Sequence, residues 1–217
     1  MFKNLFNPEN GLMITMGHVT DCIFLSLFWV ITSFPLFTIG ASSAALYDAV
    51  YYGFRQGDKH SWGRFLKSFK SNLKSGFLPG ILYLVIFGLG GWGLIQVWNA
   101  AVWEQVSFAA FSAAALVVML LLGILSILFP MLSRFHNSLW GLLRNTVLLG
   151  LLHLPRTLAL GLVNALSILL CAKFIFPLFF LPALANLLGT LFLEPMFKPY
   201  MGEEEKPAET ESTDAAE

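Results

Sequence analysis

The sequence predicts an all-α membrane protein, a polytopic helical bundle with about five transmembrane helices and additional interfacial amphipathic helices. Of the 217 residues, 57% are apolar and 12% are charged, whereas soluble domains carry about 25% charged residues. The apolar residues also form nearly uncharged runs of about 20 residues, the length that a helix needs to cross the hydrocarbon core of a bilayer. We therefore expect one transmembrane domain over residues 1–200.

Five apolar runs are the expected spans. They are residues 22–40, 77–98, 106–132, 157–176 and 177–197. For the last two, Lys173 and the prolines around it also allow a re-entrant hairpin, which enters and leaves the membrane on one side.

The second span is rich in glycine. Its glycines lie at positions 76, 80, 88, 90, 91 and 93. Since glycine has no side-chain bulk, we expect another helix to approach this one closely.

Residues 61–74 have the periodicity of an amphipathic helix. At 100° per residue, one face collects large apolar residues and a neighbouring arc collects basic residues. The apolar face holds Trp62, Phe65, Leu66, Phe69 and Leu73, and the basic arc holds Arg64, Lys67, Lys70 and Lys74. This pattern predicts a helix in the membrane interface whose basic flank contacts membrane lipid or an acidic partner surface. The simpler interpretation is an anchor that only sets topology.

The distribution of Lys and Arg predicts the orientation. Six lie between the first two expected spans, none between the second and third, and three from Arg134 to Arg156. Because cytoplasmic loops carry the excess of basic residues, residues 41–76 and 133–155 should be cytoplasmic amphipathic segments. This places the amino terminus outside and the carboxyl terminus in the cytoplasm. The acidic residues 201–217 should form a disordered tail.

A polar crevice is a second candidate site. Pro155 is expected to break the helix after His153, with Arg156 beside the break and Asn164 in the following span. Broken helices line binding sites in some transporters, although a bend capped by polar groups is the plainer interpretation. Asn164 and Asn186 are expected to hydrogen-bond between helices.

Catalytic and nucleic-acid-binding functions are not indicated. The sequence lacks the HExxH, GxSxG, P-loop and paired CxxC motifs, and the four histidines do not have metal-ligand spacing. We therefore expect no enzyme activity, no cofactor and no metal. The aromatic residues of the basic helix lie on its apolar face, which argues against nucleic-acid binding.

Several polar blocks between the spans resemble the YesL family of bacterial membrane proteins. They include NLFNPENGL, FPLFTIGASSAALYDAVYYGFR, WGRFLKSFKSNLKSG, FPMLSRFHN, LLHLPRTL and PALANLLGTLFLEPMFKPY. The family usually has a pair of acids in the turn before the basic helix, whereas QGDKHS offers only Asp58.

The resemblance implies a cell membrane protein that is an accessory component of carbohydrate uptake or sensing. Such genes commonly lie beside carbohydrate ABC transporters and sensor kinases, so the expected partners are transporter permeases or a sensor kinase. The expected mode of action is lateral association without catalysis. The alternative is a small autonomous solute transporter or channel.

Overall fold

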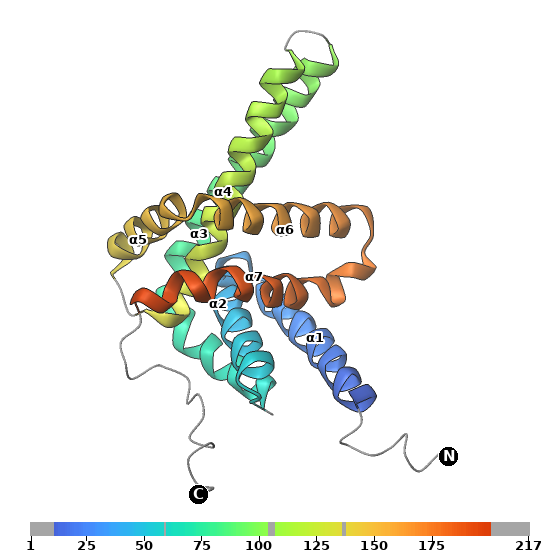
Figure 1. Ribbon diagram of the computed structural model, residues 1–217, viewed down its shortest axis with the longest axis vertical. Helices are drawn as coiled ribbons and strands as arrows, with labels where there is room; N and C mark the ends of the chain where they lie inside the picture. Colours follow the sequence, from blue (N-terminus) through green and yellow to red (C-terminus); the bar gives the residue numbers. More distant parts are fainter. Residues whose placement is uncertain (1–10, 59, 104–106, 136–137, 201–217) are drawn as a thin grey trace, which may run out of the picture.

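The computed structural model describes residues 11–58, 60–103, 107–135 and 138–200, and these residues form helices without any strand. In chain order the α-helices are α1 (Gly11–Ser33), α2 (Ile39–Val50), α3 (Ser61–Val102), α4 (Phe108–Arg134), α5 (Leu139–Leu152), α6 (Leu154–Lys173) and α7 (Leu181–Phe197) (Figure 1). Shorter helical turns are η2 (Leu36–Thr38), η3 (Tyr51–Arg55), η4 (Phe176–Phe179) and η5 (Lys198–Tyr200). The predicted all-α class is confirmed. The expected tail, residues 201–217, lies outside the described residues.

Four of the described helices, α1, α3, α4 and α6, are long and apolar enough to cross a membrane. A fifth such helix was expected at 177–197. There, however, α7 has 17 residues, about 26 Å of helix, which is short of a hydrocarbon core of about 30 Å. The shortening begins at its amino-terminal end, where Pro177 lies in the turn η4 and Pro182 in the first turn of α7. Proline is favoured in the first turn of a helix, where the amide hydrogen that it lacks has no partner within the helix.

The boundaries of the first span were predicted incorrectly. Residues 22–40 were expected to form it, but α1 begins at Gly11 and ends at Ser33. Pro35 explains the early end, because the residue before a proline is driven out of the α conformation. The chain then turns through η2 and enters α2.

The surface helix and the second span were expected to be separate elements, but they form one continuous helix. α3 has 42 residues and continues through Pro79, which gives a length of about 63 Å. Its carboxyl-terminal part and the first part of α4 form a hairpin that projects from the rest of the molecule (Figure 1). Trp98 and Phe111 pack edge to face across this hairpin, with ring centroids 5.2 Å apart.

Glycines bring α2 and α3 into close contact. A Cβ atom added to Gly80 would lie 2.9 Å from the backbone nitrogen of Gly40, and one added to Gly76 would lie 2.7 Å from the nitrogen of Ala41. No side chain fits at these distances, so the prediction of close helix packing is confirmed for Gly76 and Gly80. Cβ atoms added at the other four glycines of the set, positions 88, 90, 91 and 93, would meet no atom within 4 Å.

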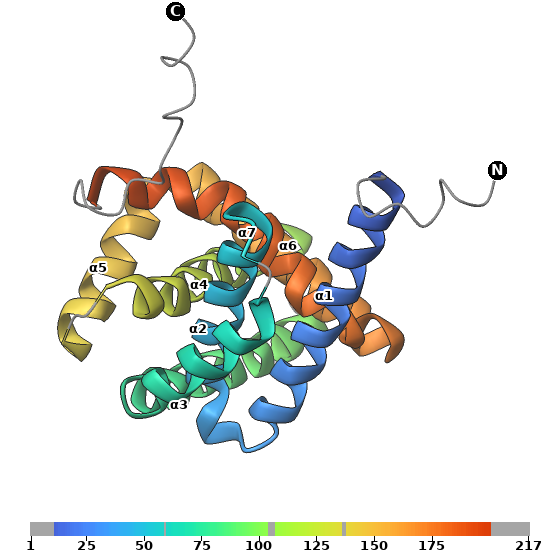
Figure 2. The same cartoon turned by 90° about the horizontal axis from the view of Figure 1, so that it is seen from below.

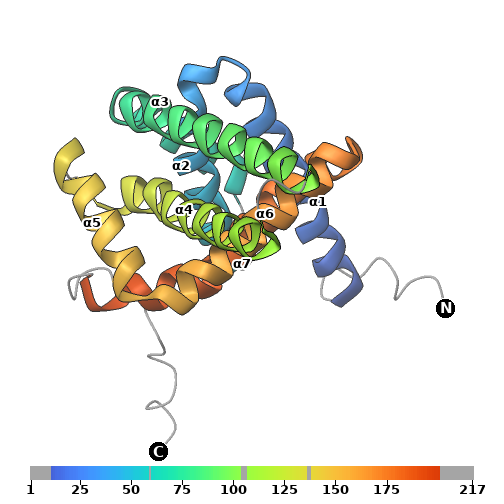
Figure 3. The same cartoon turned by 90° about the horizontal axis from the view of Figure 1, so that it is seen from above.

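α6 and α7 run across the direction of the α3–α4 hairpin (Figures 1 and 3). The crossing of α6 with α4 again uses glycine, because a Cβ on Gly123 would collide with the carbonyl of Thr157, and one on Gly161 with the carbonyl of Met119. α7 passes beside α2 and α1 (Figure 2).

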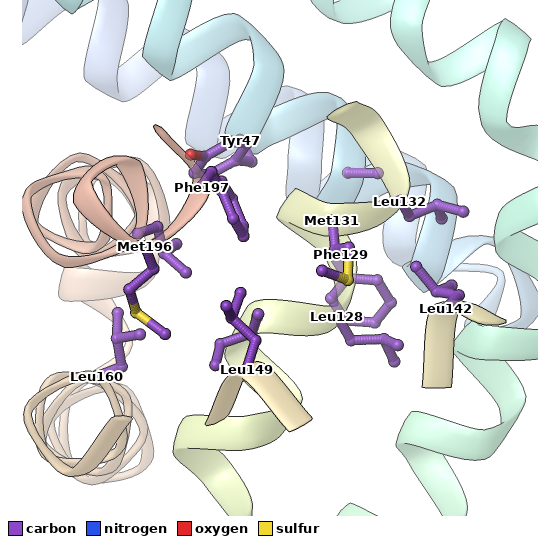
Figure 4. Packing of buried hydrophobic residues seen from close by; sticks show 13 residues of the cluster. Tyr47, Leu128, Phe129, Met131, Leu132, Leu142, Leu149, Leu160, Met196 and Phe197 are labelled. Atoms are coloured by element: carbon purple, nitrogen blue, oxygen red, sulfur yellow. The ribbon is translucent and has the colours of Figure 1, made fainter. Parts of the chain in front are cut away.

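The buried side chains form two clusters. One joins α2, α4, α5, α6 and α7 around residues such as Tyr47, Leu128, Leu160 and Phe197 (Figure 4). The second joins α1, α2, α3 and α7 around Leu25, Leu46 and Phe65. α2 and α7 contribute to both clusters, so these two helices connect the two halves of the bundle.

Candidate functional site

The basic helix was expected to place its apolar face in the membrane, but most of that face packs inside the protein. Phe65 is 0% exposed and stacks on Phe28 of α1. Leu66 and Phe69 pack against the same buried cluster. Of the face, Trp62 and Leu73 remain exposed. The aromatic pattern therefore marks a helix-packing surface, which has the same periodicity as an interfacial helix.

The four basic residues of this helix fall into two groups. Lys67, Lys70 and Lys74 are exposed on α3, and none of them forms a salt bridge with a described residue. Arg64 instead lies in an ion-pair cluster, with Nε 3.2 Å from Oδ2 of Asp48 and Nη1 3.7 Å from Oδ2 of Asp58. Arg64 therefore differs from the three lysines of the predicted binding surface, because its charge is already paired within the protein.

The Arg64 cluster explains the acid in the turn before α3. Asp58 accepts a hydrogen bond from the backbone nitrogen of His60 and pairs with Arg64. The guanidinium of Arg64 also lies over the ring of Tyr52. Burial raises the pKa of the Asp48 carboxyl, and Arg64 partly offsets this rise.

A second ion pair is more deeply buried and was not predicted. Nη2 of Arg134, at the end of α4, lies 2.9 Å from Oε1 of Glu194 in α7, and the two side chains are 5% and 13% exposed. The hydroxyl of Tyr47 donates to the same carboxylate oxygen at 2.5 Å. Burial and the charge of Glu194 together raise the pKa of this hydroxyl well above its ordinary value.

The Arg134 guanidinium also contacts the π-helical turn η3. It lies over the ring of Tyr51, 3.9 Å from the centroid, and donates to the hydroxyl of Tyr52. In the same turn Arg55 donates to Thr190 of α7. One feature of the sequence indicates this cluster. Glu194 is an acid at the end of an apolar run, where ionisable residues usually have a partner.

His153, Arg156 and Asn164 were expected to line one crevice, but the structure separates Asn164 from the other two. The helix break itself is present, since α5 ends at Leu152 and α6 starts at Leu154. His153 lies at this junction, where its backbone carbonyl accepts a hydrogen bond from Thr157 Oγ1. Asn164 lies eight residues beyond Arg156 on α6, about 12 Å along the helix, and lines a cavity to which neither His153 nor Arg156 contributes.

That cavity has a volume of about 470 Å³ and lies among α1, α2, α3, α4, α6 and α7. Its lining is largely apolar, and no described lining residue is Asp, Glu, Lys, Arg or His. The polar side chains that line it include Ser43, Tyr83, Ser126, Asn164, Ser167 and Asn186. Asn164 and Asn186 were expected to bond across helices, but each donates to a carbonyl of its own helix, Leu160 and Pro182 respectively.

A metal site is not formed by the residues that the structure describes. These residues contain no group of three His, Cys, Asp or Glu side chains that could hold an ion. Cys22 and Cys171 are both free thiols.

One family model matches the amino-terminal part of the chain. Residues 22–93 match a family model described as "Protein of unknown function, DUF624". This segment of the chain is similar to the DUF624 family. The match confirms the resemblance to YesL-like membrane proteins. No curated protein and no solved structure matches the chain.

The DUF624 segment contains about half of α1, all of α2 and most of α3. The close glycine contact between α2 and α3 and the complete Arg64 cluster both lie within it. Arg134 and Glu194 lie outside the DUF624 segment. Their ion pair connects the turn η3, which belongs to that segment, to α4 and α7.

Proposed function

We propose that this chain is a non-catalytic component of carbohydrate uptake or sensing in the bacterial cytoplasmic membrane. It acts by lateral association with an integral membrane transporter or sensor subunit. The observation that carries the proposal is the projecting hairpin of α3 and α4, whose glycines at 88, 90, 91 and 93 face open space.

The hairpin has the surface of a helix that packs against another helix. Inside the bundle, Gly76 and Gly80 serve such packing. The four hairpin glycines offer the same close approach without a neighbour among the described residues. Side chains between them, such as Leu89 and Trp92, are exposed and apolar. In lipid, close van der Waals packing at small residues is a main source of helix association.

The lysines supply a second contact at the other end of α3. Lys67, Lys70 and Lys74 are exposed and lie outside any described ion pair. With the orientation that the basic residues favour, these lysines face the cytoplasm, where an acidic surface of the partner can pair with them. Charge complementarity of this kind gives specificity and speeds association.

The ion pairs favour association over catalysis. Asp48, Asp58 and Glu194 are each bound to an arginine. A general acid or base must be free to exchange a proton with a substrate, and these carboxylates are instead engaged in ion pairs within the protein.

Affinity purification tests the proposal. The tagged protein is recovered from native membranes of cells grown on a complex polysaccharide, and the bound proteins are identified by mass spectrometry. We expect permease subunits or a sensor kinase, and we expect their recovery to fall with Gly88→Leu/Gly91→Leu and with Lys67→Gln/Lys70→Gln/Lys74→Gln. Matched controls are Gly63→Leu, where a side chain also meets open space, and Arg144→Gln, which removes an exposed charge on α5.

The competing function is a small autonomous transporter or channel. Recovery of the protein alone, as a defined homo-oligomer that moves a solute in proteoliposomes, would overturn the accessory function and establish this alternative.

A further inference from the structure

The cavity among α1, α2, α3, α4, α6 and α7 is a candidate binding site that the proposed function does not use. Its volume of about 470 Å³ falls within the usual range of small-molecule pockets, about 300–1,000 Å³. Apolar side chains such as Leu125, Phe129 and Leu160 form much of its wall. Such a wall fits an apolar part of a ligand.

The charge of the lining restricts the ligand. No described lining residue is Asp, Glu, Lys, Arg or His. A charged ligand would lose its hydration in this cavity without gaining a counter-charge, which is costly. The ligand that fits is therefore uncharged.

The polar atoms of the cavity retain hydrogen-bonding capacity. The hydroxyl of Tyr83 makes no hydrogen bond to any described residue, although its ring is held by Phe87 and Phe129. Each amide of Asn164 and Asn186 uses a donor within its own helix, which leaves the amide oxygen to accept. These groups are half-buried in the wall of the cavity, and a ligand hydroxyl can both accept from Tyr83 and donate to an amide oxygen.

Ser43 of α2 also lines the cavity with a hydroxyl group that can bind a ligand. The indole nitrogen of Trp29 donates to Oγ of Ser43 at 3.1 Å, so the hydroxyl hydrogen of Ser43 points elsewhere and is not used by a described residue. The two asparagines, Tyr83 and Ser43 come from four different helices, so only the assembled bundle brings them together.

From these observations we infer that the cavity binds an uncharged amphiphile that carries a hydroxyl group. The same chemistry is offered by a neutral lipid from the bilayer and by a small neutral alcohol from water. The inference is independent of the proposed partner, because none of its residues lies on the exposed hairpin or the lysine surface.

Trp29 allows a direct test. It lines the cavity, and the other five tryptophans are exposed by 54% to 78%, so their replacement by phenylalanine should leave the fold intact. Bromine quenches tryptophan fluorescence on contact. The probes for the purified protein in detergent are dibromostearyl alcohol, the sulfate ester of the same alcohol, and the water-soluble tribromoethanol.

We expect saturable quenching of Trp29 by the long-chain alcohol and little by its charged sulfate ester. Quenching by tribromoethanol at lower concentration than the long-chain alcohol would support the site and assign its ligand to water instead of lipid. Asn164→Leu and Asn186→Leu should each weaken binding about tenfold, whereas Asn145→Leu, on the exposed part of α5, should not. Equal quenching by the alcohol and its sulfate ester would overturn the inference.

A second measurement keeps the inference testable if the single-tryptophan protein does not fold. A ligand that binds only the native state raises the melting temperature. The unaltered protein should therefore melt at a higher temperature in the alcohol than in the sulfate ester. Identical melting temperatures with all three probes would contradict the inference.

Discussion

Arg134, the last residue of α4, is bound to Glu194 of α7 across a distance of 2.9 Å, although 60 positions separate them in the chain. Around this pair the hydroxyl of Tyr47 and the ring of Tyr51 complete a buried polar cluster. The cluster ties the DUF624 segment to the second half of the bundle. It is therefore the place where a single substitution should separate the two halves.

We expect Arg134→Met to destabilise the protein by about 3–5 kcal/mol, because Glu194 would remain buried without a counter-charge. Thermal unfolding in detergent measures the effect. Tyr47→Phe removes a single hydrogen bond to a charged carboxylate and should cost about 1.5–3 kcal/mol. The stability of the double variant Arg134→Met/Glu194→Met should be closer to that of the original protein than the stability of Arg134→Met is. A double variant that is less stable than either single variant would contradict this account.

The Arg64 cluster predicts a pH dependence. In Arg64→Gln, the ionised Asp48 is left half-buried without its partner, which should cost about 1–3 kcal/mol at pH 8. Burial already raises the pKa of Asp48, and loss of Arg64 raises it further. A raised carboxyl pKa in the folded state disfavours the ionised form, so the penalty applies above that pKa and disappears as the pH falls through it.

Melting curves of Arg64→Gln and of the original protein between pH 8 and pH 5 check this prediction, and the difference between them should shrink on acidification. Asp48→Asn/Arg64→Gln is the control, since it has no carboxyl to titrate at position 48. A difference that stays constant across this range would show that Asp48 is not the cause.

The glycines of α3 should separate into two functional groups. Gly80→Val should destabilise the fold severely, because its Cβ would lie 2.9 Å from the backbone of Gly40, and neither backbone can move away cheaply. Gly91→Val adds a side chain in open space and should leave the melting temperature within a few degrees of the original. Size-exclusion chromatography and thermal unfolding distinguish the two; equal damage by both substitutions would argue against the observed packing.

The orientation can be tested on α3 alone. Ser71 and Asn99 are both exposed and are separated by 28 residues of one helix, about 42 Å, which exceeds a hydrocarbon core of about 30 Å. In a protein without Cys22 and Cys171, a cysteine at Asn99 should react with an impermeant maleimide in intact cells. A cysteine at Ser71 should react only after permeabilisation. The reverse labelling pattern would invert the proposed topology.

The candidate sites show how far a pattern of residues can be interpreted. Residues 61–74 have one amphipathic pattern, which suits both a membrane surface and a neighbouring helix. The structure assigns Phe65 to the neighbouring helix. Similarly, Arg64 and Lys67 look equivalent on a helical wheel, but only Arg64 lies within reach of Asp48. Neither distinction can be derived from periodicity, because both depend on which helices lie beside α3.

The sequence by itself determined the helical class, the membrane environment, the break at Pro155 and the glycines that allow α3 to pack closely. Each of these depends on local chemistry: the length of an apolar run, the missing amide hydrogen of proline, or the missing side chain of glycine. Only the tertiary structure decided that Arg134 meets Glu194, that Asn164 belongs to a neutral cavity and not to the His153 junction, and that α3 is continuous. These outcomes depend on contacts between segments far apart in the chain, where burial and pairing set the free energy of each polar group.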